Sequence, residues 1–163
     1  MNWAIAILAF VTAERILELW VARTNTRRLL AQGAQEHGAH HYPFLVFLHA
    51  AWLAALWLLA PGRGIDMFWL AIFVLLQALR IWIIATLGPR WTTRIIVLPG
   101  TPLVRKGPYR LLDHPNYWVV VGEIAVLPLV FALPLVALVF TILNIVLLSI
   151  RIREENKALA SHR

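Results

Sequence analysis

The chain contains no cysteine and few charged side chains. Of its 163 residues, 14% are charged and 61% are hydrophobic. The absence of cysteine excludes disulfide bonds, thiolate metal sites and cysteine nucleophiles. The shortage of charge excludes a soluble domain of this size, because too little polar surface remains to cover the apolar part. The composition therefore predicts an integral membrane protein built as one small helical domain.

Five apolar segments are long enough to be interpreted as membrane-spanning helices. They cover about residues 2–21, 44–60, 66–87, 115–130 and 134–150. The first lacks a positively charged leader, so we expect a retained helix and not a cleaved signal peptide. The connection between the last two carries no charge and should lie in or near the bilayer. We predict an all-α integral membrane protein with about five transmembrane helices and a C-terminal helical hairpin.

Basic residues are distributed unevenly along the chain. There are 15 Lys and Arg against 8 Asp and Glu, a net charge of +7. Most of the basic residues fall in the connection before residue 44, in residues 88–114, and in the tail, which holds Arg151, Arg153, Lys157 and Arg163. The positive-inside rule then predicts a multi-pass protein of the inner or plasma membrane, with these regions in the cytoplasm. Anionic lipid headgroups account for the charge, so we predict membrane lipids and no nucleic acid as partners.

A polar, turn-rich insert interrupts the apolar sequence at residues 105–117. Proline is tolerated at the first position of a helix, so Pro115 predicts a helix start with Asp113 or His114 as its cap. The free backbone N–H groups at such a start attract a carboxylate or a phosphate. The preceding turn, residues 107–109, brings backbone close to a ligand. The insert therefore predicts an anion-binding helix start.

A second polar cluster, residues 151–155, follows the last apolar run. Arg151, Glu154 and Glu155 are spaced i, i+3 and i+4, so they share one face if the fifth helix continues past the membrane. We expect them to face the start of the fourth helix, where carboxylates suit an ammonium group. A charged collar at a membrane exit is an alternative explanation for this cluster alone. Two polar clusters flanking one membrane hairpin favour a site, with its cofactor on the cytoplasmic side.

In order, these motifs resemble one family of membrane enzymes. The residues that carry the resemblance are Gly107-Pro108-Tyr109-Arg110, His114-Pro115-Asn116-Tyr117 and Arg151-Ile152-Arg153-Glu154-Glu155. They resemble the isoprenylcysteine carboxyl methyltransferase family over about residues 77–160. The run 79–92 is similar to its bacterial members, including those linked to methylation of alkylated pyrones and resorcinols. The resemblance implies a single membrane methyltransferase domain over 1–163, with N-terminal helices over 1–65 and a catalytic core over 66–163.

The resemblance also implies a reaction and roles for individual residues. The reaction is S-adenosylmethionine-dependent methyl transfer to an oxygen, carboxylate or hydroxyl, of a lipophilic small-molecule or prenylated acceptor at the membrane interface. Arg151 would be the catalytic residue that orients the acceptor. The implied cofactor-binding residues are His114, Tyr117, Glu155, Glu154, Gly107, Pro108 and Tyr109. Asp113 departs from the family, in which arginine often precedes His-Pro, and we interpret it as a helix cap.

Other polar residues receive structural interpretations. Arg80 is expected to pair inside the membrane with Glu123 or with a glutamate of the first helix, Glu14 or Glu18. His49 either faces the acceptor cavity or makes a hydrogen bond between helices. Residues 36–41 hold metal-capable side chains, but Gly33 and Gly38 argue against an ordered site, and we predict no metal.

Two other functions are compatible with parts of the pattern. A membrane reductase that uses NADPH is one, because steroid and sterol reductases share a similar His-x-Asn-Tyr motif. The Arg-x-x-Glu-Glu tail is not expected there. A small membrane transporter or scaffold would account for the length and hydrophobicity, but it leaves the polar insert unexplained, and no inverted halves are visible.

Overall fold

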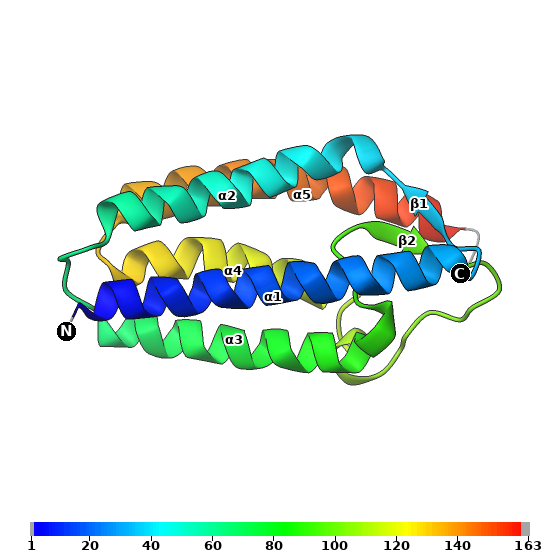
Figure 1. Cartoon of the computed structure of the whole chain (residues 1–163), viewed down its shortest axis with the longest axis horizontal. Coiled ribbons are helices and arrows are strands. Elements are labelled where there is room, and N and C mark those ends of the chain that lie inside the picture. The colour runs from blue at the N-terminus through cyan, green and yellow to red at the C-terminus, as the bar shows by residue number, and fades with distance from the viewer. Residues whose placement is uncertain (1, 161–163) are drawn as a thin grey trace.

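The computed structural model describes residues 2–160, so Arg163 of the basic tail lies outside the described residues. Five long helices form a bundle whose long axis they follow (Figure 1). Their bounds are α1 Trp3–Ala31, α2 Tyr42–Leu59, α3 Met67–Leu87, α4 Pro115–Val130 and α5 Pro134–Leu159. Helix α4 packs against both α3 and α5, and α2 packs against α5. The predicted all-α architecture and the C-terminal hairpin are confirmed.

The exterior of the bundle is apolar, as a membrane requires. The side chains of Phe47, Leu58 and Leu135 are 74%, 82% and 75% exposed. Contiguous exposed apolar surface of this kind is rare on soluble monomers and is typical of lipid-facing helices. In the described part of the chain, the helices over Ala39–Leu59, Met67–Arg90 and Pro134–Leu159 are long and apolar enough to cross a membrane. Helix α4 is apolar but shorter. The protein is an integral membrane protein.

Helix starts follow the sequence closely. Asp66 caps α3, and its carboxylate accepts hydrogen bonds from the backbone N–H groups of Phe68 (2.9 Å) and Trp69 (3.2 Å). Pro115 and Pro134 stand at the first positions of α4 and α5. Proline fits there because its missing N–H would have no partner inside the helix.

The first and fifth helices are longer than their apolar runs. The predicted end of α1 near Val21 is wrong, because the helix continues to Ala31. No proline or glycine interrupts the polar stretch until Gly33, whose φ of 88° ends the helix in the left-handed conformation. Asn25 also fixes this extension, since its amide donates to the carbonyl oxygens of Gly88 (3.2 Å) and Trp91 (2.9 Å). Helix α5 likewise continues past Ile150, which satisfies the condition for a shared face in the tail.

Two short strands add to the predicted helices. Strand β1, Gln35–His37, pairs antiparallel with β2, Ile95–Val97, and Glu36 lies opposite Ile96. Short 3-10 helices cover Ala39–His41, Gly88–Arg90 and Gly107–Arg110. The sequence analysis did not predict these strands, because three residues are too few for a periodic pattern. The strands join the two long connections at the end of the bundle where α1 and α5 finish (Figure 1).

A network of buried charges ties α1, α3 and α4 together. The Arg80 guanidinium donates to both Glu18 carboxylate oxygens and to Glu123 (2.7 Å). Arg15 donates to Glu18 (2.9 Å) and to Glu123 (3.1 Å). The predicted intramembrane pairing of Arg80 is confirmed for both proposed partners. Buried charges are tolerated when each has an opposite charge and hydrogen bonds, as here.

Candidate active site

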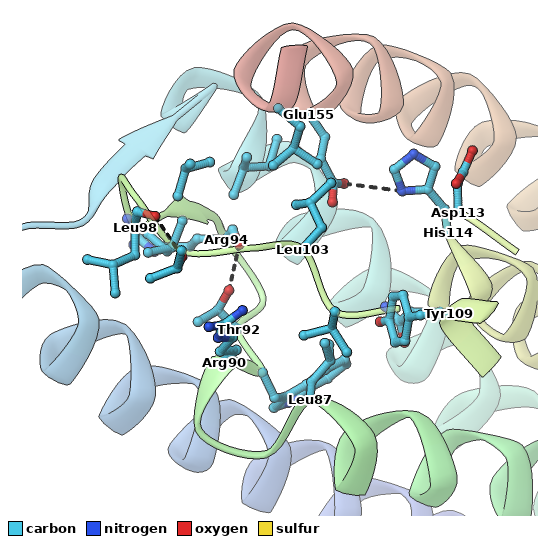
Figure 2. A pocket seen from close by; sticks show the side chains of 18 of the residues that line it. Leu87, Arg90, Thr92, Arg94, Leu98, Leu103, Tyr109, Asp113, His114 and Glu155 are labelled. Carbon is cyan, nitrogen blue, oxygen red and sulfur yellow. Dashed lines mark hydrogen bonds and ion pairs between the residues drawn. The ribbon is translucent and has the colours of Figure 1, made fainter. Parts of the chain in front are cut away.

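A cavity of about 600 Å³ lies at the end of the bundle that carries the strands. Polar residues of α4 and α5 form one side of it, and the connection over 90–105 forms the other (Figure 2). Among the predicted site residues, those that line it are Tyr109, His114, Tyr117, Arg151 and Glu155. The structure therefore brings the two polar motifs together around one cavity.

Tyr117 connects the two motifs. Its hydroxyl donates a hydrogen bond to Glu155 and accepts one from Arg151 Nε at 2.8 Å. His114 stacks on the Tyr117 ring, with ring centroids 5.2 Å apart and planes 22° apart. His114 Nδ1 also approaches Glu155 Oε2 to 3.8 Å, the contact drawn in Figure 2. One tyrosine thus holds a carboxylate, a guanidinium and an imidazole in fixed relation.

Arg151 is buried and forms no ion pair with a carboxylate of the described residues. The whole residue is 8% exposed, and its guanidinium carbon lies 5.6 Å from the centre of the Tyr117 ring. Within residues 2–160, Arg151 makes no ion pair, and its one hydrogen bond to a side chain goes to the neutral Tyr117 hydroxyl. A buried cation without an anion is costly. The arrangement suits a ligand that brings a negative oxygen to Arg151.

Three of the predicted cofactor residues do not line this cavity. Glu154 points to Lys157, whose ammonium group donates to it at 2.9 Å. The expectation that both glutamates face the start of α4 is therefore wrong, because the i+3 and i+4 positions diverge by one step around the helix. Gly107 packs toward α3 instead, and Pro108 beside it is buried. A Cβ on Gly107 would meet Thr86 Oγ1 at 2.7 Å, and its φ of 56° favours glycine.

The structure places one of the two predicted caps at the N-cap position of α4, but without the expected hydrogen bond. His114 occupies the N-cap position, and its side chain makes no capping hydrogen bond. Asp113 is exposed and lies at the rim of the cavity (Figure 2). Pro115 has no backbone N–H, and the N–H of Tyr117 donates to the His114 carbonyl oxygen (3.1 Å), so at the start of α4 it is the N–H of Asn116 that stays available to a ligand.

A second cavity, of about 300 Å³, adjoins the first. It lies mainly between α1 and α2, and most of its lining is apolar. The residues that line both cavities are Trp91, Thr92, Asn116, Tyr117 and Arg151. The polar cavity and the apolar cavity thus share one wall, which includes the unpaired guanidinium.

Comparison with known proteins agrees with this geometry. A model of the isoprenylcysteine carboxyl methyltransferase (ICMT) family matches residues 69–161. The chain belongs to the ICMT family. It is 38% identical to the uncharacterized protein YpbQ of Bacillus subtilis over 161 residues, which cover 96% of each chain. It is 26% identical to an uncharacterized protein of Haemophilus influenzae over 158 residues, which cover 93% of this chain and 92% of the relative. No solved structure matches significantly.

Membership of the ICMT family identifies a membrane methyltransferase, and the matched region contains both polar motifs. The sequence analysis nevertheless missed residues that shape the site. Asn116 lines both cavities, and its Oδ1 is buried without a hydrogen-bond partner in the described chain. Its position inside the His-Pro-Asn-Tyr motif was the available signal. Burial also raises the pKa of the Tyr109 phenol, so this hydroxyl stays protonated and can donate at the cavity wall.

Proposed function

We propose that this ICMT-family protein transfers a methyl group from S-adenosylmethionine to an oxygen, carboxylate or hydroxyl, of a lipophilic acceptor. The observation that carries the proposal is the wall shared by a polar cavity and an apolar cavity. A charged methyl donor requires a polar cavity and a lipophilic acceptor requires an apolar one. The two cavities must meet where the methyl group is transferred. The whole chain, 1–163, would act as one methyltransferase domain, with α1 and α2 completing a catalytic core over 66–163.

The polar cavity has the features that the methyl donor requires. Its volume of about 600 Å³ is typical of small-molecule pockets. Glu155 offers a carboxylate for the ammonium group of an amino acid, and the start of α4 beside His114 offers the backbone N–H of Asn116 for its carboxylate. Asn116 also lines this space from the start of α4. Apolar side chains such as Leu87 and Leu103 provide surface for the adenine ring of the methyl donor (Figure 2).

Arg151 would orient the acceptor. S-adenosylmethionine supplies a methyl group on a sulfonium, which is a good leaving group, so the protein must mainly align the reactants and exclude water. Arg151 reaches the wall between the cavities while Tyr117 holds its Nε, which leaves the outer nitrogens of the guanidinium for an acceptor oxygen. A guanidinium binds a carboxylate through two parallel hydrogen bonds and stabilises a phenolate as well.

The proposed site belongs at a membrane surface. The strands, the connection over 88–114 and the end of α5 all gather at one end of the bundle (Figure 1). This end carries the excess of basic residues, so we place it in the cytoplasm, against the anionic lipids of the inner or plasma membrane. The methyl donor would enter from the cytoplasm and the lipophilic or prenylated acceptor from the bilayer.

Calorimetric titration of the purified protein with S-adenosylmethionine and, separately, with NADPH tests the proposal. We expect saturable binding of S-adenosylmethionine and none of NADPH. Assays with a prenylated-cysteine analogue and an alkylresorcinol then test methyl transfer. Binding of NADPH alone would replace the proposal with a membrane reductase.

A further inference from the structure

His49 is a histidine that lines the apolar cavity. The arginines beside it stay protonated and cannot act as bases, whereas a neutral imidazole can. His49 lies on α2, between the cavity residues Leu45 and Leu53. Its Nδ1 is 2.8 Å from the carbonyl oxygen of Leu45. A carbonyl only accepts, so Nδ1 carries the proton. In the neutral ring Nε2 therefore holds a lone pair, and no residue from 2 to 160 makes a hydrogen bond to it.

The imidazole leans toward the site. Helical side chains point back toward the start of their own helix. The start of α2 lies at the end of the bundle that carries the polar cavity (Figure 1). His49 and Arg151 line the same cavity of about 300 Å³, one from α2 and one from the wall shared with the polar cavity. A base and a cation thus face one small apolar volume.

Glu18 and Tyr42, which line the same cavity, are already engaged. Glu18 accepts hydrogen bonds from Arg15 and Arg80. Tyr42 shares a hydrogen bond with Thr93 at 3.0 Å. A carboxylate held by two guanidinium groups is a weak base, so Glu18 does not compete with an imidazole lone pair for a proton.

We infer that His49 is the general base of the proposed reaction, and that the acceptor is a weakly acidic hydroxyl, phenolic or enolic, on an apolar chain. This inference rests on the proposed function. A carboxylic acid is ionised at neutral pH and needs no base, whereas a phenol with a pKa near 10 must lose its proton. A base that lines the same apolar cavity as a guanidinium has a use only for the second class.

The step is balanced. The hydroxyl proton moves to Nε2 of His49, and the acceptor oxygen forms a bond to the methyl carbon. The carbon–sulfur bond breaks, and its electron pair stays on sulfur, which becomes a neutral thioether. Arg151 stabilises the negative charge that develops on the oxygen. The proton leaves His49 for water when the products depart.

Two acceptors with the same alkyl chain test the inference. One is a simple alkylphenol, and the other is an alkylnitrophenol that is already ionised at the assay pH. With saturating S-adenosylmethionine, His49→Gln should lose about 100-fold or more in turnover of the alkylphenol. The same variant should turn over the alkylnitrophenol nearly as fast as wild type, because this acceptor needs no base. Leu53→Ala, which changes the shape of the same cavity, should affect both acceptors alike.

A second measurement requires no turnover. The absorbance of a more weakly acidic alkylnitrophenol, bound without methyl donor, reports the fraction that is ionised. His49→Gln should lower this fraction, and His49→Asn, which can keep the hydrogen bond to Leu45, should lower it equally. The affinity for S-adenosylmethionine, measured by calorimetry, should be unchanged in both variants.

Three results would overturn the inference. They are an equal loss of turnover on both acceptors, an unchanged bound spectrum, and a wild-type enzyme that methylates carboxylates but no phenol. A protein that does not bind S-adenosylmethionine at all defeats the proposed function itself, and the calorimetric control separates that case from the others.

Discussion

The protein holds two groups of buried charges, and they are built differently. In the bundle interior, Arg15 and Arg80 are each bound to Glu18 and Glu123. At the cavity wall, Arg151 is as buried as Arg80, but among the described residues its side-chain partner is a tyrosine hydroxyl. Fully paired charges hold helices together, whereas an incompletely paired charge keeps its binding capacity for a ligand. The predictions below test whether the two groups separate stability from function.

The largest effect should come from the interior group. Arg80→Leu leaves two buried carboxylates without their main partner, and we expect a loss of about 3–5 kcal/mol in the free energy of unfolding. Denaturation in detergent micelles measures this loss. Arg94→Leu is the matched control, since Arg94 pairs with Glu36 at 40% side-chain exposure and should cost about 0–1 kcal/mol. Equal losses in both variants would contradict the structural role of the interior network.

Glu155→Gln should act on ligand binding instead of on the fold. It removes the carboxylate proposed to hold the ammonium group of S-adenosylmethionine, an interaction worth about 1.5–3 kcal/mol. The dissociation constant should therefore rise roughly 10- to 150-fold in calorimetry. Glu154→Gln is the control, because Glu154 faces Lys157 and should change the constant little. An unchanged constant for Glu155→Gln would remove this residue from the cofactor site.

Arg151→Lys should separate turnover from cofactor affinity. Lysine keeps the charge but loses the planar pair of donors, so turnover at saturating cofactor should fall about tenfold, or about 1.4 kcal/mol in activation free energy. The affinity for S-adenosylmethionine should stay nearly the same. Rate assays with a prenylated-cysteine analogue and an alkylresorcinol, beside calorimetry, measure both quantities. Full turnover by the lysine variant on every accepted substrate would exclude Arg151 from the mechanism.

The smallest effect should come from Asp113→Asn. Asp113 is exposed and makes no capping bond, so stability should change by less than about 0.5 kcal/mol. His114→Ala should weaken cofactor binding more, because it removes the ring stacked on Tyr117. Titration of the two variants with S-adenosylmethionine compares them. The reverse order would mean that the site is misplaced by one residue.

The sequence predicted most of the bundle, because apolar runs and helix-starting prolines are local signals. Helix α4 begins at Pro115 and ends at Val130, as predicted. The end of α1 was missed because the polar segment before Gly33 stays helical through contacts with distant backbone. The strands were missed for a related reason, since their pairing joins residues 35–37 to residues 95–97. Non-local contacts of this kind leave no pattern in a short stretch of sequence.

The site was predicted less completely than the fold. Motif spacing correctly brought Arg151 and Glu155 to the start of α4. Spacing did not resolve neighbouring positions on one helix, so Glu154 was placed wrongly. For Gly107 the motif predicted a place in the cofactor site, and the structure shows close packing on Thr86. The residue types in the motifs indicated which segments form the site. Which side chains point into the cavity could be determined only from the structure.

The residues that line the two cavities come from different parts of the chain. Most of its lining comes from α1 and α2, which lie before the region, 69–161, that matches the family model. The polar cavity draws mainly on the matched region. Changes confined to the first two helices would therefore alter the shape of the apolar cavity and leave most of the polar cavity as it is. Exchange of residues 1–65 between two relatives is, on this view, a way to exchange their acceptors.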